Sequence, residues 1–156
     1  MDTHKVRVNN HEFLSKIGEM LKSGKHKSVT IVVRGNSMNP FLVSERDKVI
    51  LTRPKRPEIG EVILAEIKPT VYALHRIIKI EGNVITMLGD GNPNWMQERF
   101  TSDKIIATAI GFIRKEKEIS TKSVKWRLYT TIWMNTPAIM RRICLSIYRR
   151  IIIKLY

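Results

Sequence analysis

The chain has 156 residues, a length that suits one domain with an appendage, and its apolar content of 43% is enough for a core, which excludes wholesale disorder. A single cysteine, Cys144, excludes an internal disulfide framework and a cysteine-rich zinc site. The net charge of +14 is uneven, because residues 114 to 156 hold 11 Lys and Arg against 2 acidic residues, a net of +9. This asymmetry predicts an anionic partner for the C-terminal segment.

Residues 1 to 27 predict a short helix and its lead-in. Apolar side chains recur at helical spacing between positions 10 and 23, with Asn10 as the expected cap and Gly24 as the expected end. The first ten residues lack the apolar stretch of a signal peptide, and no run of about 18 apolar residues occurs in the chain. We therefore expect a cytoplasmic protein whose first helix packs its apolar face on the rest of the chain.

Residues 28 to 116 predict a small, curled, mainly β domain. Short β-rich runs alternate with connections rich in Pro and Gly, and Glu81-Gly82 joins two runs as a tight hairpin. Closely spaced strands of this kind are typical of compact all-β domains. The runs cover residues 28–34, 48–52, 61–67, 71–80, 83–88 and 104–115.

Residues 117 to 156 predict a basic, amphipathic helical tail with one helix over 121–134 and a second that starts near Pro137. Three interpretations stay open. The tail packs on the domain as a helical hairpin, or lies in an anionic membrane interface at the inner face, or binds nucleic acid or a protein. The absence of a recognisable reading motif argues against sequence-specific nucleic-acid binding. In the membrane interpretation, the lipid-facing side chains are expected to be Trp126, Trp133, Arg141, Arg142, Arg149 and Arg150.

Ser37 stands where a predicted strand ends, in a stretch whose Gly, Asn and Pro residues are typical of turns. A serine becomes a nucleophile only beside a base that takes its proton. His75 lies among apolar residues of a predicted strand, where it is either such a base or a core histidine bonded to backbone. Asp90, between Gly89 and Gly91, either forms a tight turn or orients His75.

The order of five short motifs resembles the superfamily of type I signal peptidases and of self-cleaving SOS and phage repressors. The resemblance spans about residues 28 to 115 and implies that superfamily's β-fold. The motifs are Gly35-Asn36-Ser37-Met38-Asn39-Pro40, Asp47-Lys48-Val49, Gly60-Glu61-Val62-Ile63, Leu74-His75-Arg76-Ile77 and Gly89-Asp90-Gly91-Asn92.

The resemblance implies a role for each matched position. Ser37 would attack the scissile carbonyl, His75 would be its base, and Asp90 would be the acid that supports the base. Backbone N–H groups of the loop that holds Gly35, Asn36 and Met38 would form the oxyanion hole. A second acid of related enzymes falls at position 96, where this chain has Met96, and the substitutes nearby are Glu98 and Asp103.

The sequence thus predicts a serine endopeptidase that cleaves a leader or propeptide through an acyl-enzyme, with no cofactor and no metal. Trp95 and Pro40 are expected to line the substrate groove. The alternative is a module that has kept the fold, has lost catalysis and binds a peptide or a membrane. With neither an N-terminal membrane helix nor a cleavable Ala-Gly or Cys-Gly bond before Ser37, we expect neither a general secretory signal peptidase nor a self-cleaving repressor.

Overall fold

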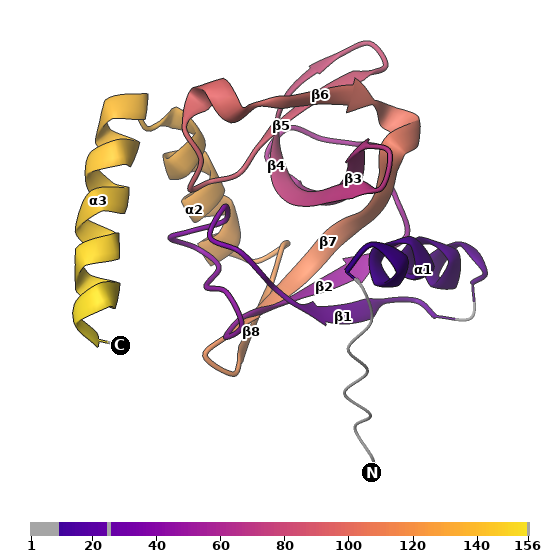
Figure 1. The fold of residues 1–156 in the computed structure, drawn as a ribbon, viewed down its shortest axis with the longest axis horizontal. Helices are drawn as coiled ribbons and strands as arrows, with labels where there is room; N and C mark the ends of the chain where they lie inside the picture. Colours follow the sequence, from indigo (N-terminus) through magenta and orange to yellow (C-terminus); the bar gives the residue numbers. More distant parts are fainter. Residues whose placement is uncertain (1–9, 25, 156) are drawn as a thin grey trace.

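The computed structural model describes residues 10 to 24 and 26 to 155, and Figure 1 shows their arrangement. A first helix, α1 (Asn10–Lys22), precedes a β-domain, and two further helices follow it, α2 (Val124–Asn135) and α3 (Ala138–Leu155). The predicted helices are therefore confirmed, with α1 ending just before Gly24, whose φ is +72°. The expected capping side chain of Asn10 lies outside the described residues.

Eight strands and two short 3₁₀ helices, η1 (Asn94–Met96) and η2 (Ser102–Lys104), make up the β-domain. All six predicted strands are present, and two strands that the sequence did not reveal, β6 and β8, are only four residues long. The strands are β1 (Val29–Val32), β2 (Lys48–Thr52), β3 (Val62–Lys68), β4 (Val71–Glu81), β5 (Val84–Leu88), β6 (Glu98–Thr101), β7 (Ile105–Arg114) and β8 (Lys117–Ser120).

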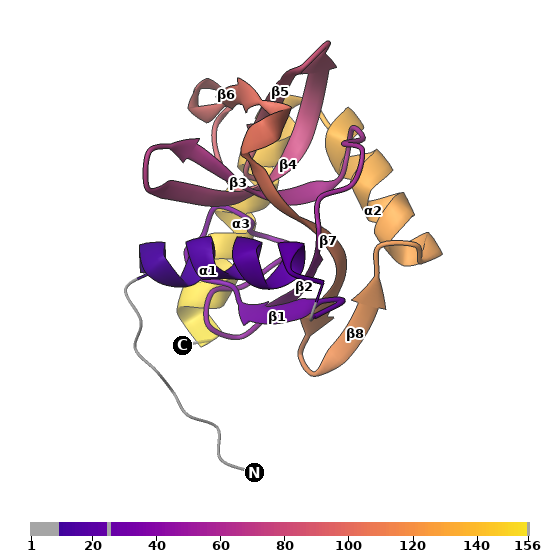
Figure 2. The same ribbon diagram turned by 90° about the vertical axis from the view of Figure 1, so that its right-hand side faces the viewer.

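The strands form one antiparallel sheet in the order β1-β2-β7-β3-β4-β5-β6, and β8 also pairs with β7. The long strand β7 joins the two parts of this sheet, because it pairs with β2 near one end and with β3 near the other. Strands β3 to β6 curl over on one side of β7, and α1 lies beside β1 and β2 on the other (Figures 1 and 2). The predicted fold class, a small and mainly β domain, is confirmed.

Strand β3 explains why the curled sheet has two apolar clusters. Its successive side chains point to opposite faces, as in any strand. Val62 and Leu64 belong to the larger cluster, which also includes side chains of α1, β2 and β7, whereas Ile63 and Ala65 belong to the smaller cluster inside the curl of β3 to β6. Burial on both faces fits the continuous apolar run of β3, which a strand with one wet face would not show.

Helix α2 is built into the larger cluster. Trp126 is 5% exposed, and its ring lies 4.4 Å from that of Phe112 and 4.7 Å from that of Phe41. Trp133 is 6% exposed and stacks on Tyr129. The expectation that Trp126 and Trp133 face lipid is therefore wrong, because both rings bury their area against protein instead.

The sequence boundary at 116/117 does not separate two bodies in the structure. Strand β8 continues the sheet through its pairing with β7, and α2 follows β8 after a short turn. The hydroxyl of Ser123 caps α2 by accepting a hydrogen bond from the N–H of Trp126. Only α3 stands out from the β-domain (Figure 1). None of the described helices combines the length and the apolar character that crossing a membrane requires.

The loop between β1 and β2 is anchored at its end by Asp47. The side chain of Asp47 is fully buried and accepts hydrogen bonds from Arg46 Nε at 2.7 Å and from the N–H of Val43 at 2.9 Å. Its carbonyl accepts from the N–H of Val33 at 2.9 Å, which closes the loop. Burial by itself would raise the pKa of Asp47, but the hydrogen bonds from Arg46 and Val43 and the charge of Arg114 hold this pKa below its ordinary value.

Replacing Trp126 with Ala should lower the free energy of unfolding by about 3–5 kcal/mol, because a large buried ring is lost from a packed cluster. The matched control is Leu128→Ala on the same helix, where the side chain is 58% exposed and the change should stay within about 0.5 kcal/mol. Urea denaturation followed by far-UV circular dichroism measures both. Equal, small effects of the two variants would show that α2 is not part of the core.

Replacing Asp47 with Asn should destabilise the protein at neutral pH by about 1–3 kcal/mol, because the N–H groups of Val43 and Arg46 lose a charged acceptor. A lowered folded-state pKa stabilises the fold above the unfolded-state value, and this stabilisation is lost as the pH falls through the folded-state pKa. The gap between wild type and variant should therefore shrink from about pH 5 downward. Urea denaturation at a series of pH values measures this gap, and a constant gap would contradict the assignment.

Candidate active site

Ser37 lies in a tight turn of the loop between β1 and β2. The N–H of Asn39 donates to the carbonyl of Asn36 at 3.1 Å, and the N–H of Leu42 donates to that of Met38 at 2.9 Å. Gly35, just before the turn, has a φ of +86°, a conformation that residues with a side chain rarely adopt. The turn that holds Ser37 therefore begins at a position that favours glycine.

His75 lies on β4, where it is buried and bonded to a carboxylate. Its Nδ1 is 3.0 Å from Oε2 of Glu98, which is half-buried at the start of β6. Because an ionised carboxylate only accepts hydrogen bonds, this contact assigns the proton to Nδ1. In the neutral imidazole, Nε2 then keeps its lone pair, which is the arrangement of an imidazole that serves as a base.

Ser37, His75 and Glu98 line one cavity of about 870 Å³. The rest of its wall is mainly apolar, and most of its apolar residues come from four elements. Phe13 and Leu14 of α1 contribute to it, as do Ile31 and Val32 of β1. Further lining residues are Leu64 and Ile67 of β3 and Tyr72, Ala73 and Leu74 of β4. A concave apolar wall with a few convergent polar groups is the usual composition of a ligand site.

Gly89 lies between the main chain of Ser37 and the ring of His75. A methyl group placed on Gly89 would lie 2.5 Å from the carbonyl oxygen of Ser37 and 3.0 Å from Cδ2 of His75. Only a glycine therefore fits between the main chain of the turn and the imidazole. Within the described part of the chain, the hydroxyl of Ser37 makes no hydrogen bond to His75. Such bonds commonly tighten only when substrate binds.

The turn also offers donors for an oxyanion. Among the described residues, Asn39 and Leu42 donate their N–H groups within the turn, whereas those of Ser37 and Met38 bond to no protein acceptor. The Met38 side chain is 2% exposed and holds the turn in the larger apolar cluster. The side-chain oxygen of Asn36 accepts a long hydrogen bond of 3.5 Å from Asn39. The free N–H groups of Ser37 and Met38 are thus the candidate oxyanion donors.

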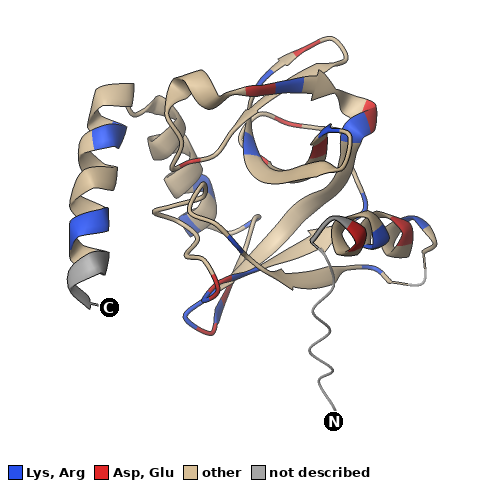
Figure 3. Ribbon diagram, viewed as in Figure 1, with Lys and Arg blue, Asp and Glu red and all other residues tan. Residues whose placement is uncertain are grey.

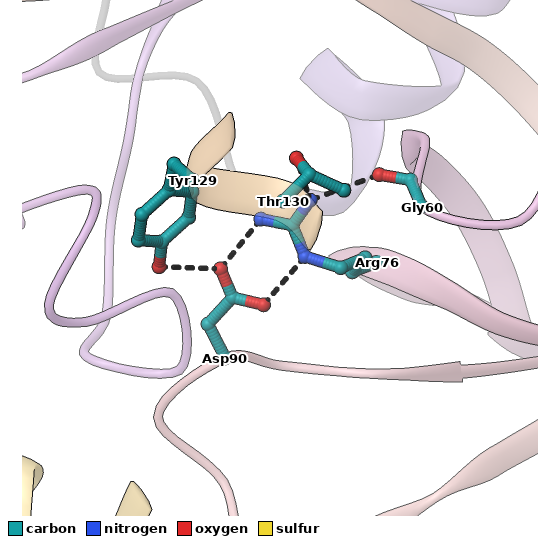
Figure 4. A network of polar contacts seen from close by, with 5 residues as sticks. All are labelled: Gly60, Arg76, Asp90, Tyr129 and Thr130. Atoms are coloured by element: carbon teal, nitrogen blue, oxygen red, sulfur yellow. Dashed lines mark hydrogen bonds and ion pairs between the residues drawn. The ribbon is translucent and has the colours of Figure 1, made fainter. Parts of the chain in front are cut away.

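Asp90 does not contact His75, contrary to the sequence-based prediction. Both of its oxygens pair with Arg76, Oδ1 with Nε at 2.7 Å and Oδ2 with NH2 at 2.6 Å (Figure 4). The hydroxyl of Tyr129 donates to Oδ2 at 3.1 Å. Successive residues of a strand point to opposite faces, so His75 faces the cavity while Arg76 faces α2. Arg76 therefore takes the carboxylate, and the acid beside His75 is Glu98.

Arg76 is 1% exposed, and five groups surround its guanidinium. Besides the two contacts to Asp90, NH1 donates to the carbonyl of Gly60 at 2.9 Å and to the hydroxyl of Thr130 at 3.0 Å (Figure 4). The rings of Trp126 and Tyr129 lie 4.8 Å and 5.6 Å from the guanidinium carbon. Burial alone would lower the pKa of Arg76, but the adjacent Asp90 carboxylate raises it above its ordinary value. Burial and the same carboxylate raise the pKa of Tyr129.

Asp90 still acts on the site through its neighbours. Gly89 separates Ser37 from His75, and the N–H of Gly91 donates to the carbonyl of Ser37 at 2.7 Å. The carboxylate between these two glycines is fixed by Arg76. Asp90 is therefore a positioning residue for the turn that holds Ser37.

Two residues expected in the substrate groove lie elsewhere. Trp95 is 82% exposed on η1, and the described cavity wall passes through its neighbour Met96 instead. Pro40 follows a cis peptide bond from Asn39 and is not one of the residues that line the cavity. Neither side chain lines the described cavity.

Within the described residues, no group of three or more His, Cys, Asp or Glu side chains is placed to hold a metal ion. The polar residues of the cavity wall are instead Ser37, His75 and Glu98, together with Arg34, Glu45, Tyr72 and Asn92. This set matches a hydroxyl nucleophile with an oriented base.

Comparison with known proteins agrees with the fold. Residues 4–111 match the family model described as Peptidase S24-like, a stretch that covers more than half of the chain and includes Ser37, His75, Asp90 and Glu98. No curated protein matches the chain. On the extent of the family match, the chain belongs to the peptidase S24-like family.

Proposed function

We propose that this protein is a serine endopeptidase that cleaves a leader or propeptide through an acyl-enzyme. The observation that carries the proposal is the arrangement around one cavity, whose wall holds both Ser37 and an imidazole with its Nδ1 bonded to Glu98 at 3.0 Å. Ser37 is the nucleophile, His75 is the general base, and Glu98 orients the imidazole. Membership of a peptidase family supports the same class of reaction.

The proposed reaction follows from these positions. The Oγ of Ser37 attacks the scissile carbonyl carbon while its proton passes to Nε2 of His75, and the Glu98 carboxylate stabilises the imidazolium that forms. The N–H groups of Ser37 and Met38 donate to the carbonyl oxygen as it becomes negative. His75 then returns the proton to the departing amine, which leaves an acyl-enzyme. A water molecule activated by His75 hydrolyses this ester and restores the serine.

An extended peptide fits the surroundings of the cavity. Strand β1 is at one end of the sheet order and pairs with β2, so a substrate strand can add along its outer edge. Ile31 and Val32 of the same strand line the cavity, which brings such a peptide to Ser37. The apolar wall favours apolar substrate side chains. Because the peptidases that this chain resembles favour small residues before the cut, we propose small residues there as well.

The cellular setting is part of this proposal. We propose that the enzyme works on the cytoplasmic side and takes a substrate presented at the inner membrane face. The basic composition of residues 114 to 156 supports attraction to an anionic surface at that place.

A second function is favoured by one observation, the absence of a hydrogen bond between Ser37 and His75 in the described structure. On this function the protein binds a peptide along β1 and does not cleave it. Binding without cleavage then proceeds equally well in wild type and in Ser37→Ala, so the experiment below separates the two functions.

Ser37→Ala should abolish cleavage, and Glu98→Gln should lower kcat by about 10²–10⁴-fold because the imidazole loses the charge that orients it. The assay uses a library of peptides with defined ends, and mass spectrometry identifies new termini. Glu58→Gln, at an exposed carboxylate outside the cavity, is the matched control and should leave kcat unchanged. Equal cleavage by wild type and Ser37→Ala would exclude the peptidase, and binding without cleavage would support the second function.

Asp90→Asn should lower the free energy of unfolding by about 3–5 kcal/mol, because it leaves the buried Arg76 charge without its counter-charge. Glu98→Gln should leave the free energy of unfolding within about 1 kcal/mol of wild type, since Glu98 is half-buried and in contact with the cavity. Urea denaturation of both variants tests this division. A stable Asp90→Asn protein would contradict the structural role of the pair.

A further inference from the structure

The outward side of α3 is an apolar surface that the rest of the described chain leaves uncovered. Five side chains at helical spacing form it, each between 53% and 69% exposed. We call this set the outer face of α3. Its members are Ile139, Met140, Ile143, Ile147 and Ile151. Scattered single exposed aliphatics are ordinary, but a continuous row on one side of a helix marks a surface with a partner.

The opposite side of α3 holds the helix to the protein. Leu145 is 7% exposed, and NH2 of Arg141 donates to the side-chain oxygen of Asn94 at 3.3 Å. Leu145 lies two residues from both Ile143 and Ile147, which is about half a helical turn away. The helix is therefore fixed by one side, and the exposed side chains of its outer face lie on the other.

The charged residues that follow Glu118 in the sequence are all basic. No acidic residue follows Glu118 in the sequence, and the described part of α3 carries Arg142, Arg149 and Arg150 as exposed cations. Figure 3 shows blue segments and no red segment on α2 and α3, in contrast to the mixed charges of α1. An apolar row beside exposed arginines is the composition of a helix that lies in the interface of an anionic bilayer.

Helix α2 repeats the pattern on its own outward side. Val124, Leu128 and Ile132 follow one another at four-residue spacing and are 57–79% exposed. They lie opposite Trp126 and Trp133, which face the core. Two consecutive helices thus each expose a row of aliphatic side chains, so the exposure is a property of the whole segment.

We propose that the outer face of α3 docks on an anionic phospholipid membrane, with the helix parallel to the surface. The membrane explains both features together, since lipid chains accept the aliphatic row while head groups neutralise the arginines. A second copy of this chain fits less well, because face-to-face contact brings arginines against arginines. Nucleic acid accounts for the arginines and not for five exposed aliphatic side chains. The proposal concerns binding alone and does not depend on catalysis.

The test is sedimentation of the full chain with vesicles that contain phosphatidylcholine and phosphatidylglycerol. The wild type should bind, and binding should weaken as salt is raised. Ile143→Gln combined with Ile147→Gln should lower the partition coefficient at least tenfold, because two side chains that would enter the lipid become polar. Arg149→Gln combined with Arg150→Gln should lower it about fivefold for each charge. Vesicles of phosphatidylcholine alone should bind weakly.

The matched control is Ile59→Gln combined with Val71→Gln, two apolar side chains of the β-domain that are 59% and 45% exposed. These changes should leave binding unchanged. Three results would overturn the proposal. The first is that the isoleucine pair binds as the wild type does, and the second is that the control pair loses binding equally. The third is that the wild type fails to bind the vesicles, and conversion of a dimer to a monomer by the isoleucine pair in light scattering would then identify a second copy of the chain as the partner. Far-UV circular dichroism establishes that each variant is folded.

Discussion

The buried pair of Arg76 and Asp90 is the constraint on which the remaining structure depends. The two side chains are 1% and 2% exposed, and two short hydrogen bonds join them. A charge withdrawn from water to this degree is stable only with a counter-charge and a complete set of hydrogen bonds. Gly60, Tyr129 and Thr130 complete that set. Strand β4, the loop after β5 and helix α2 must therefore meet at one point.

The ion pair and its partners lie behind the cavity and fix the positions of the residues that line it. His75 and Arg76 are neighbours on β4, so fixing the Arg76 side chain on one face fixes the imidazole on the other. Asp90 likewise holds Gly89 and Gly91 in place, and these glycines touch His75 and bind the carbonyl of Ser37. The residues proposed for chemistry thus lie in a front layer, and the ion pair forms a layer behind them. Such support limits the freedom of a site that has to hold its groups within small tolerances.

Most of the fold could be predicted from the sequence, because apolar alternation and turn residues mark the long strands. The short strands β6 and β8 could not be, since four residues give too little periodicity. The positions of Ser37 and His75 were also visible as motifs. The partner of His75 was not, because a sequence does not show that Arg76 competes for Asp90. Glu98 stood only as one of two nearby acids, and the pairing of β5 with β6 brings it to the imidazole.

The tail shows a different limit of sequence patterns. Helical spacing reveals that a helix has an apolar row, but not which row faces protein. Trp126 and Trp133 suggested an aromatic membrane contact, yet aromatic rings bury more area in the core than aliphatic side chains do. The tryptophans of α2 are therefore buried in the core, and its isoleucine and valine side chains are exposed to solvent.

This arrangement also connects the two proposals in space. Arg141 binds Asn94, which opens the short helix η1, and Met96 at the end of η1 lines the cavity two residues before Glu98. A membrane-bound α3 would thus hold one wall of the cavity at a fixed distance from the lipid surface. A substrate that emerges from that surface would then reach β1 and Ser37 without first diffusing through the bulk solution. Restricting the encounter in this way raises the effective concentration of a weakly bound peptide, so modest contacts in an apolar cavity suffice for recognition.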